Sequence, residues 1–528
     1  MADVRSEMHW SRWGDPAQAR PLPDEARSLV DAFVGTRAVR TVTPEAVALS
    51  EPLDDALVEE LRGLVGEHVQ TDHDARLHHT RGKSTPDLLR MRAGDGADSP
   101  DAVVRPGSHA EVQAVVDWAV RRHVALVPFG GGTSVVGGLV ARREGFAGVV
   151  SLDLARLDRL VEVDPESMTA VLGAGLRGPQ AEALLAEHGL TLGHFPQSFE
   201  FATVGGFAAT RSSGQSSAGY GRFDAMVVGL VMATPRGTLD LGRAPATAAG
   251  PDLRQLVLGS EGAFGVVTSV RVRVRRLPEA RTYAGWRFAS FSEGCAAMRT
   301  LAQDGSRAGL LPTVLRLSDE TETMVNLASP DAVGAASDGG CLMIVGHEGG
   351  QEAVESRRAA TATVLEGLGG TDLGATPGQA WADGRFAGPY LRDSLLDVGV
   401  LVETLETATF WGNLANLYDQ VRRALARSLE GALVLCHVSH VYETGASLYF
   451  TVAAKEADDP VAQWRSAKGA ATDAIVAAGG SITHHHAIGR DHQPWLAAEV
   501  GEVGVEMLRA VKERLDPTGV LNPGVLVP

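Results

Sequence analysis

The stretch Pro128-Phe129-Gly130-Gly131-Gly132-Thr133-Ser134-Val135-Val136-Gly137-Gly138, PFGGGTSVVGG, carries the most information about the fold. It follows an apolar run typical of a buried strand. Its consecutive glycines permit positive φ and remove side chains, so backbone N–H groups can converge on an anion. The spacing is neither GxGxxG nor a Walker loop, because no Lys follows in the required place. Taken alone, it fits a phosphate site and a ligand-free turn about equally well.

The flanking sequence predicts the elements around this loop. Residues 102–127, AVVRPGSHAEVQAVVDWAVRRHVALV, predict a strand, a turn, a helix capped by Ser108 and a second strand. A strand is expected at 265–275, where the run VVTSVRVRVRRL alternates apolar and charged residues as a half-buried strand does. Further expected elements are a helical region at 23–64 with a helix start at Pro44, helices near 179–188 and 495–515, and a strand at 224–234.

Composition narrows the function classes. A chain of 528 residues is too long for one hydrophobic core, so we expect two or more domains. The net charge of −17 argues against nucleic acid as a main partner. The three cysteines show neither a disulfide framework nor zinc spacing. No apolar signal region starts the chain and no run reaches the roughly 18 apolar residues of a membrane span, so we expect a cytoplasmic protein and leave peripheral membrane contact open.

Three later segments share the composition of the first loop. They read HFPQSFEFATVGG at 194–206, FAATRSSGQSSAGYGRFDAMVVGL at 207–230 and GSEGAFGVVT at 259–268. Each is rich in Gly, Ser or Thr and lies close to an apolar strand. Several separated loops of this kind suit an extended ligand, such as a dinucleotide, that is held mostly by backbone groups.

Together with the ending LDPTGVLNPG, these segments resemble the vanillyl-alcohol oxidase type (PCMH-type) of FAD-binding flavoprotein. The resemblance implies an α+β fold: a two-subdomain FAD-binding domain, an α+β cap domain and a helical N-terminal segment. It also implies FAD. Members that bind flavin covalently usually attach it through His or Cys, and PFGGGTSVVGG holds neither, so we expect noncovalent FAD. The cofactor-binding residues it implies are Pro128, Phe129, Gly130, Gly131, Gly132, Thr133, Ser134, Pro196, Gln197, Ser198, Phe199, Glu200, Phe201, Ala202, Ala209, Thr210, Arg211, Ser212, Glu261, Gly262, Ala263, Phe264, Gly265, Val266 and Val267.

Changes in composition and pattern along the sequence, together with this resemblance, divide the chain into four parts. We expect an N-terminal, mostly helical segment at 1–97 and the FAD-binding domain at 98–278. A substrate or cap domain follows at 279–474. A C-terminal segment at 475–528 returns to the flavin site. No internal repeat or low-complexity tract stands out.

A narrower resemblance covers nearly the whole chain. MHWSRWGDP, PTVLRLSD, PYLRDSLLDVGVLVETLETATFW, SHVYETGASLYF and THHHAIGR are similar to the alkyldihydroxyacetonephosphate synthase family, also called alkylglycerone-phosphate synthases. The resemblance implies an FAD-dependent alkyl transferase of ether lipid synthesis. Such an enzyme exchanges the acyl group of acyl-dihydroxyacetone phosphate for a long-chain alcohol through a flavin N5 adduct, with no net redox change. It implies a lipid phosphate and a fatty alcohol as partners, and a homodimer.

The family pattern also implies roles for single residues. Tyr449 matches a catalytic tyrosine, and the His triplet (His484, His485 and His486) matches an essential run. Arg316 matches a functionally important arginine of the cap, and Arg392 a substrate-binding one. Histidine titrates near neutral pH and suits proton transfer, and an arginine can clamp phosphate or carboxylate through two hydrogen bonds. No metal is expected.

Ordinary readings of the same residues stay open. In an extended chain His484 and His486 point one way and His485 the other, so all three cannot reach one substrate atom unless the turn at 487–489 bends them. The run could also be a metal site, a surface tract or a tag scar. The arginines could form structural ion pairs. Tyr449 lies in SLYFTVAA, a plain buried-strand pattern.

Some positions depart from the family pattern. The family commonly has Asp where this chain has Gln197, and Gly and Lys where it has Ala487 and Arg490. These departures leave room for a different substrate. The alternative is an FAD-dependent 2-hydroxy acid dehydrogenase or oxidase, similar to D-lactate and glycolate dehydrogenases. A third possibility is a flavin-containing binding protein without turnover. Net reduction of the flavin by substrate distinguishes the dehydrogenase or oxidase from the alkyl transferase, because only the former reduces its flavin and needs an electron acceptor.

Overall fold

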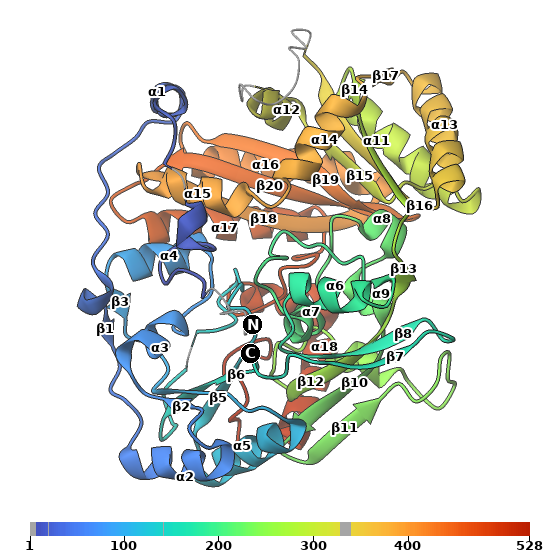
Figure 1. The fold of residues 1–528 in the computed structure, drawn as a ribbon. Helices are drawn as coiled ribbons and strands as arrows, with labels where there is room; N and C mark the ends of the chain where they lie inside the picture. Colours follow the sequence, from blue (N-terminus) through green and yellow to red (C-terminus); the bar gives the residue numbers. More distant parts are fainter. Residues whose placement is uncertain (1–6, 20, 141, 328–338) are drawn as a thin grey trace.

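The structure of the protein, a computed structural model, describes residues 7–19, 21–140, 142–327 and 339–528. The chain forms a four-stranded, a five-stranded and a seven-stranded sheet, with helices packed around them (Figure 1). The seven-stranded sheet lies in the upper part of the view and the other two lie below it. The largest buried apolar clusters separate in the same way, one in each half, as the chain length requires.

The N-terminal segment is less helical than predicted. Its helices are α1 (Asp24–Phe33), α2 (Asp55–Val65), α3 (His73–His78) and α4 (Thr85–Arg92). Pro44 begins only a three-residue 3₁₀ turn, so the helix expected there was wrong. The chain leaves that turn for strand β1 (Ala48–Leu49), which pairs in parallel with β3 (Asp95–Gly96), and this pairing ends the turn. Residues 1–6, where a signal region was sought, lie outside the described residues.

The four-stranded sheet holds the glycine loop at one end. Its order is β2 (Val69–Gln70), β4 (Ala102–Val104), β6 (Val149–Asp153), β5 (Ala125–Phe129). Helix α5 (His109–Arg122) crosses between the parallel strands β4 and β5, and the Ser108 side chain accepts from the N–H of Glu111 as its cap. The predicted order of strand, turn, helix, strand and glycine loop is confirmed.

The five-stranded sheet is antiparallel and carries the other predicted cofactor segments on its connections. Its order is β11 (Gly237–Leu241), β10 (Val227–Thr234), β12 (Val266–Arg273), β8 (Thr169–Gly173), β7 (Leu160–Asp164). Short helices between its strands are α6 (Gly178–Ala186), α7 (Val204–Thr210), α8 (Ser217–Tyr220), α9 (Phe223–Met226) and α10 (Leu253–Val257). A two-stranded sheet, β9 (Leu190–Thr191) with β13 (Arg275–Arg276), leads toward the cap. The strands predicted at 224–234 and 265–275 are confirmed within a few residues.

The cap is one antiparallel sheet with helices around it. Its order is β17 (Thr371–Asp372), β14 (Ala280–Phe288), β16 (Cys341–Gly349), β15 (Val314–Ser318), β19 (Leu433–Val441), β20 (Gly445–Lys455), β18 (Val400–Phe410). Its helices are α11 (Phe291–Thr300), α12 (Glu320–Leu327), α13 (Gln351–Gly367), α14 (Ala375–Gly384), α15 (Gly388–Leu396), α16 (Leu414–Ser428) and α17 (Pro460–Ala477). This arrangement is the α+β architecture that the sequence predicted.

The C-terminal segment returns to the lower half. Helix α18 (Leu496–Leu515) matches the predicted helix and is interrupted at Gly501, where φ is +74°. After it, the backbone N–H of Asn522 donates to Leu126 O of β5 at 2.7 Å. The Asn522 side-chain amide donates to the carbonyls of Gly138 and Glu261. The chain end therefore fastens two of the predicted cofactor segments to each other.

Among the described residues, no helix combines the length and the apolar character needed to cross a bilayer.

Candidate active site and flavin cradle

The glycine loop touches a second predicted cofactor segment. A Cβ placed on Gly131 would lie 2.0 Å from the carbonyl oxygen of Phe201, and one on Gly130 would lie 2.4 Å from Thr203 Oγ1. Both distances are far below van der Waals contact, so only glycine allows this approach. Gly132 adds a positive φ of +69°. The loop after β5 and the segment ending at Ala202 therefore form one surface.

The same loop has free hydrogen-bonding capacity. Within the described ranges, no backbone N–H from Gly131 to Ser134 donates a hydrogen bond to the protein, and the Thr133 hydroxyl makes none. The loop is only partly buried, and the Ser134 carbonyl is fixed by the N–H of Lys83 at 2.7 Å. Backbone N–H groups that converge without internal partners fit an anionic ligand. This observation fits the pyrophosphate of FAD.

Two further cofactor segments meet at Glu261. Its N–H donates to Ala209 O at 3.0 Å, and its φ of +49° aims its carboxylate at the C-terminal segment. That carboxylate accepts from the N–H groups of Ile488 and Gly489, at 3.1 and 2.8 Å. Burial raises the pKa of Glu261 to about 7 against the lowering effect of these two hydrogen bonds. Glu261 thus links the predicted flavin cradle to the residues that follow the His triplet.

Several predicted cofactor residues have side chains that are buried or already bonded within the protein. Ala263, Phe264 and Val266 are buried in the core of the lower half. The Arg211 side chain is held by Asp224 at 2.8 Å. Gln197, the departure from the family's Asp, donates from Nε2 to the carbonyl of Arg385 in the cap at 3.0 Å. The structure brings the predicted segments together, and their contacts with FAD stay predictions.

The His triplet is bent around one buried carboxylate. Glu406 of β18 accepts hydrogen bonds from the N–H groups of His484, His485 and His486, at 2.5, 3.1 and 2.9 Å. It also accepts from the Thr483 hydroxyl at 2.6 Å. Three successive N–H groups reach one carboxylate only when the chain curves around it. Of the two arrangements left open by the sequence, the chain therefore adopts the bent one. The Nδ1 atoms of His485 and His486 lie 3.7 and 3.8 Å from the Glu406 carboxylate oxygens.

Turn geometry closes this bend. Ala487 has a φ of +72°, an uncommon left-handed conformation for a residue with a side chain. Gly489 has a φ of +55°, and a Cβ there would lie 2.0 Å from Val136 O. The position therefore excludes any other residue. The departure at Ala487 falls at a strained position, where the family's Gly would adopt this φ without cost.

The cap sheet delivers Tyr449 to the triplet through its register. Tyr449 of β20 lies directly opposite Glu406 of β18 on one side and His437 of β19 on the other. Directly opposed residues project to the same face of a sheet. The Tyr449 ring stacks on His437 with centroids 4.9 Å apart, and it lies 6.0 Å from His485 and 5.7 Å from His486. Burial raises the pKa of Tyr449 to about 12, so it is protonated at neutral pH.

The triplet has a buried member and two that are more accessible. The side chains of His485 and His486 are 15% and 14% exposed, whereas His484 is buried. His484 Nε2 lies 2.6 Å from the Tyr442 hydroxyl, and its Nδ1 lies 3.0 Å from His485 Nδ1. One of these two Nδ1 atoms must be the donor and the other the acceptor. If His484 Nδ1 donates to His485, its Nε2 accepts from Tyr442, and if Nδ1 accepts, Nε2 donates. His485, His484 and Tyr442 therefore form a hydrogen-bonded chain along which a proton can shift.

Burial keeps the histidines neutral. It lowers the pKa of His484 well below its ordinary value, and the pKa of His486 to about 3. It lowers the pKa of His485 as well, and the nearby Glu406 carboxylate opposes both changes. Burial alone would raise the pKa of Glu406, but the surrounding histidines and the Thr483 hydrogen bond bring it well below its usual range. A neutral imidazole beside a carboxylate can act as a proton acceptor.

A metal reading of this cluster has one geometric candidate, His440 with His484 and His485. The rings of His440 and His484 are stacked, with an interplanar angle of 22°, so their nitrogen lone pairs lie in nearly parallel planes and do not converge. His440 Nδ1 is already within 2.6 Å of Ser217 Oγ and 3.1 Å of Ser213 Oγ. The arrangement favours a hydrogen-bonded network.

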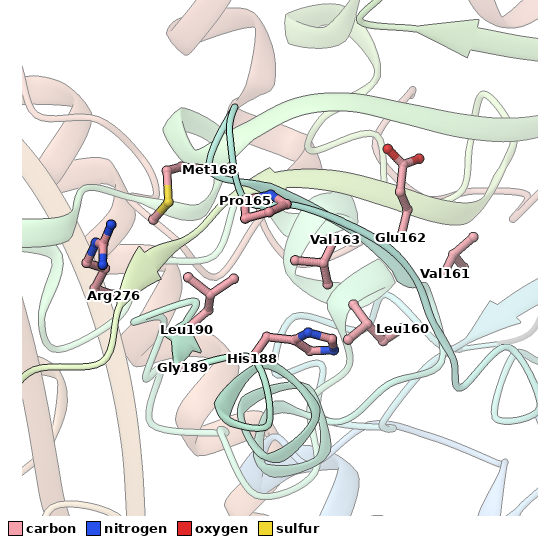
Figure 2. A pocket seen from close by; sticks show the side chains of 10 residues that line it. All are labelled: Leu160, Val161, Glu162, Val163, Pro165, Met168, His188, Gly189, Leu190 and Arg276. Atoms are coloured by element: carbon pink, nitrogen blue, oxygen red, sulfur yellow. The ribbon is translucent and has the colours of Figure 1, made fainter.

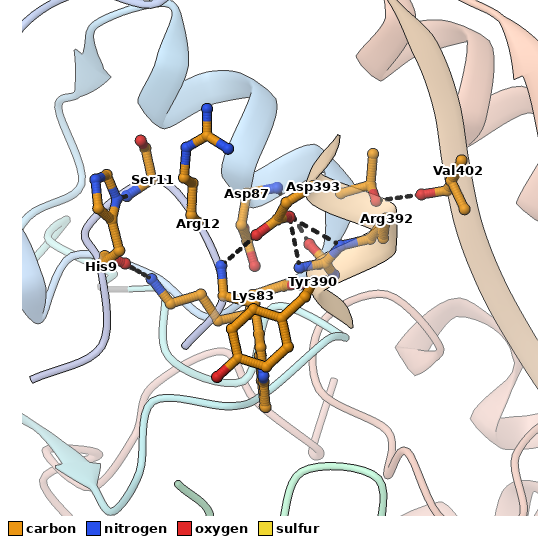
Figure 3. Close-up of polar contacts among 12 residues, drawn as sticks. His9, Ser11, Arg12, Lys83, Asp87, Tyr390, Arg392, Asp393 and Val402 are labelled. Carbon is orange, nitrogen blue, oxygen red and sulfur yellow. Dashed lines mark hydrogen bonds and ion pairs between the residues drawn. The ribbon is translucent and has the colours of Figure 1, made fainter. Parts of the chain in front are cut away.

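The two predicted arginines both have protein partners. Arg316 of β15 pairs with Glu322 at 2.7 Å and lies 3.0 Å from Nδ1 of His437. His437 belongs to β19, the strand next to the one that carries Tyr449. Arg392 of α15 donates to the Lys83 carbonyl at 2.6 Å and to Asp393 (Figure 3). Their contact with a substrate stays a prediction.

Arg392 belongs to a junction of three segments. The Lys83 ammonium donates to the His9 carbonyl at 2.6 Å, and Asp393 accepts from the N–H of Trp13 (Figure 3). Burial lowers the pKa of Lys83 to about 8. The junction joins the N-terminal residues, the segment beside the glycine loop and the cap helix.

Sequence reasoning missed several members of this site. Glu406 and Glu322 were not singled out, nor were His437, His440 and Tyr442 given roles. A carboxylate in the apolar strand VETLETATF is a signal that a buried partner exists elsewhere. The partners of Glu406 lie 77 to 80 positions away, so no local pattern reveals them.

An open groove of about 630 Å³ lies elsewhere, beside the edge strand β7 (Figure 2). None of the predicted site residues lines it. Its lining residues are Leu160, Val161, Glu162, Val163, Pro165, Met168, His188, Gly189, Leu190 and Arg276.

Comparison with known proteins agrees with this geometry. Residues 100–241 match the family described as FAD binding domain, and residues 277–526 match the one described as FAD linked oxidases, C-terminal domain. FAD is therefore the cofactor.

Several similar proteins are synthases that match most of the chain. The chain is 34% identical to the alkyldihydroxyacetonephosphate synthase of Dictyostelium discoideum, over 88% of this chain and 79% of that protein. It is 32% identical to the synthase of Trypanosoma brucei brucei, over 100% and 94%. A solved structure of an alkyldihydroxyacetonephosphate synthase superposes with a TM-score of 0.85 at 30% identity, over 99% of each chain. The chain therefore belongs to the alkyldihydroxyacetonephosphate synthase family, on the FAD-binding fold of the vanillyl-alcohol oxidase type.

Proposed function

We propose that the protein is an FAD-dependent alkyl transferase that exchanges the acyl group of acyl-dihydroxyacetone phosphate for a long-chain alcohol, which produces an ether lipid precursor. The observation that carries this proposal is the Glu406 assembly. One buried carboxylate accepts from the backbone N–H groups of three neutral histidines, and the rings of His485 and His486 lie beside Tyr449. The chain that follows the triplet is tied to the predicted flavin cradle through Glu261.

The exchange is balanced without a redox partner. The bond between C1 and the ester oxygen breaks, and the fatty acid leaves with both of its oxygens. The hydroxyl oxygen of the alcohol forms the new bond to C1 and gives up its proton. Two proton exchanges therefore need groups that change protonation state easily, and none of these steps consumes an electron acceptor.

The accessible histidines supply the proton acceptors. His485 and His486 are neutral and reach the more open side of the cluster, so either can take a proton from substrate or alcohol. Tyr449 stays protonated and is placed to donate a hydrogen bond or a proton to a developing negative charge. His484 lies behind them and passes its hydrogen bond to Tyr442.

The cradle formed by the glycine loop, the 196–202 segment and Glu261 would hold FAD, bound without a covalent link. When bound, FAD supplies the electron-deficient ring on which covalent catalysis of this exchange depends. The chain's own contribution is to bind, orient and exchange protons. Release of intact FAD on acid precipitation of the protein tests the noncovalent attachment.

Anaerobic titration followed by product analysis tests the function. With acyl-dihydroxyacetone phosphate and fatty alcohol, we expect fatty acid and ether product in equal amounts and without an added electron acceptor. Oxygen label placed in the alcohol should be retained in the ether. Absence of ether product, together with flavin reduction by D-lactate that reverses only with an electron acceptor, would overturn the proposal in favour of a 2-hydroxy acid dehydrogenase.

A homodimer and peripheral contact with membranes are part of the same proposal. They suit an enzyme whose family handles lipid phosphates and fatty alcohols. Light scattering of the purified protein measures the mass of the assembly. Flotation with lipid vesicles measures membrane contact.

A further inference from the structure

One arginine at the junction of the two halves has no anionic partner. Arg385 lies between α14 and α15, and its guanidinium carbon is 4.9 Å from the ring centroids of Phe195 and Phe386 and 5.9 Å from that of Trp381. Its NH1 nitrogen is buried and has no hydrogen-bond partner. In the described part of the chain, no carboxylate lies within ion-pair distance of it.

The contrast with neighbouring arginines makes this notable. Arg316 is paired with Glu322, Arg392 with Asp393, and Arg12 with Asp397. Arg385 as a whole is half-buried, but its NH1 group lies out of water without an acceptor, and this is costly for a charged group. Aromatic rings offset part of this cost, because their faces attract a cation, but they do not satisfy N–H donors.

Arg385 is also held firmly in place. Its backbone carbonyl accepts from Gln197 Nε2 at 3.0 Å and from Gln215 Nε2 at 3.1 Å. Gln197 belongs to the predicted cofactor segment. Gln215 lies on the loop whose Ser213 and Ser217 contact His440. Arg385 is therefore fixed one loop away from the histidine cluster and next to the flavin cradle.

We propose that Arg385 binds the phosphate group of the substrate. A guanidinium offers parallel N–H donors that match the oxygens of a phosphate monoester. The surrounding rings shield the NH1 nitrogen from water, and this strengthens its attraction for an anion. They also offer an apolar wall to a substrate that carries a fatty chain. The choice of a phosphomonoester as the ligand rests on the proposed function. The observation that Arg385 has an unsatisfied N–H donor does not depend on that function.

The test uses the FAD-loaded protein and two readouts. Calorimetric titration with inorganic phosphate reports anion binding without turnover, and steady-state kinetics report KM and kcat for acyl-dihydroxyacetone phosphate. In Arg385→Met we expect phosphate affinity to fall at least tenfold and KM to rise about 10- to 100-fold, as the loss of one charge-assisted clamp predicts, with kcat changed less than about threefold. Arg385→Lys should recover part of both. The matched control is Arg307→Met, because Arg307 pairs with Glu443 on the exposed surface of the cap.

The outcomes separate this inference from the proposed function. Equal phosphate binding by wild type and Arg385→Met, with both proteins folded and loaded with FAD, would overturn it. Selective loss of FAD in both Arg385 variants would also overturn it, because Arg385 would then serve the cofactor. If phosphate binding depends on Arg385 but no ether product forms with any alcohol, the anion site stands and the proposed function fails. Should Arg385→Met not fold, Arg385→Lys decides through the same two readouts.

Discussion

Replacing Glu406 by Gln removes the charge at the centre of the histidine cluster and leaves its size unchanged. One carboxylate oxygen accepts from Thr483, His485 and His486, and the other accepts from His484 alone. A glutamine keeps an oxygen for the three donors and turns its NH₂ group toward the N–H of His484. One buried donor then loses its acceptor, and the other three hydrogen bonds are no longer charge-assisted.

These losses set the expected size of the effect. An unsatisfied buried N–H costs roughly 1–3 kcal/mol, and hydrogen bonds to a charged group are about twice as strong as neutral ones. The removed burial cost of the carboxylate offsets part of the sum, which leaves about 3 kcal/mol. If this geometry is needed in the transition state, kcat should fall by about 10², because each 1.36 kcal/mol corresponds to a factor of ten.

The pH profile gives a second readout that simple loss of stability would not change. The Glu406 charge raises the pKa of His485 and His486 against the stronger lowering effect of burial. Without it both pKa values fall, so the acidic limb of the activity profile should move to lower pH. The folded-state pKa of Glu406 lies well below 4.5, so its contribution to stability is present above that pH and is lost as the pH falls. The stability deficit of Glu406→Gln should therefore shrink in acid.

Kinetics across a pH series, with denaturation curves at the same pH values, measure both effects. Glu403→Gln is the matched control, because Glu403 is buried on the same strand but accepts from the N–H groups of Thr85 and Thr404 and not from the triplet. It should leave the acidic limb unchanged, because the Glu403 charge acts on the pKa of Tyr449 and not on those of His485 and His486. Wild-type kcat and an unshifted acidic limb in Glu406→Gln would refute the reasoning, whatever happens to stability.

Three further predictions concern the cradle and the tyrosines. Tyr449→Phe should retain FAD and lose about 10²- to 10⁴-fold in turnover, the usual worth of a positioned proton donor, and an active variant would remove the hydroxyl from the mechanism. Tyr442→Phe should slow turnover about tenfold and alter its pH dependence, because His484 loses a hydrogen-bond partner at 2.6 Å. The control is Tyr418→Phe, because the Tyr418 hydroxyl donates to Asp319. Equal effects of the two substitutions would argue against a proton relay through Tyr442. Gly131→Ala should give protein without visible flavin absorbance, because its Cβ would lie 2.0 Å from a backbone carbonyl, and a fully loaded variant would place FAD elsewhere.

Much of the lower half could be predicted from sequence because its signals are local. Ser108 caps α5 through a neighbour three residues away, and the glycines of the first loop follow directly on the strand that positions them. The alternation of β12 could likewise be recognised without knowing its partner strands. The helix expected at Pro44 failed for the opposite reason, because a strand pairing with residues near position 95 ends the turn there.

The same distinction between local and long-range signals applies to the candidate site. The His triplet is visible in the sequence, and the family pattern singles out Tyr449. The orientation of the triplet was not visible, because it depends on Glu406, which a long stretch of chain separates from it. Arg392 was recognisable by its motif, but only the structure shows its bonds to Lys83 and Asp393.

The sequence by itself therefore determined the fold family, the cofactor and the residue types of the chemistry, because each is written in short contiguous motifs. The tertiary structure decided which groups meet. The register of β18, β19 and β20 sets Tyr449 between Glu406 and His437, and a one-residue slip would turn every one of these side chains to the other face of the sheet. Burial then keeps the histidines neutral and Tyr449 protonated, and burial is a property of the packed molecule.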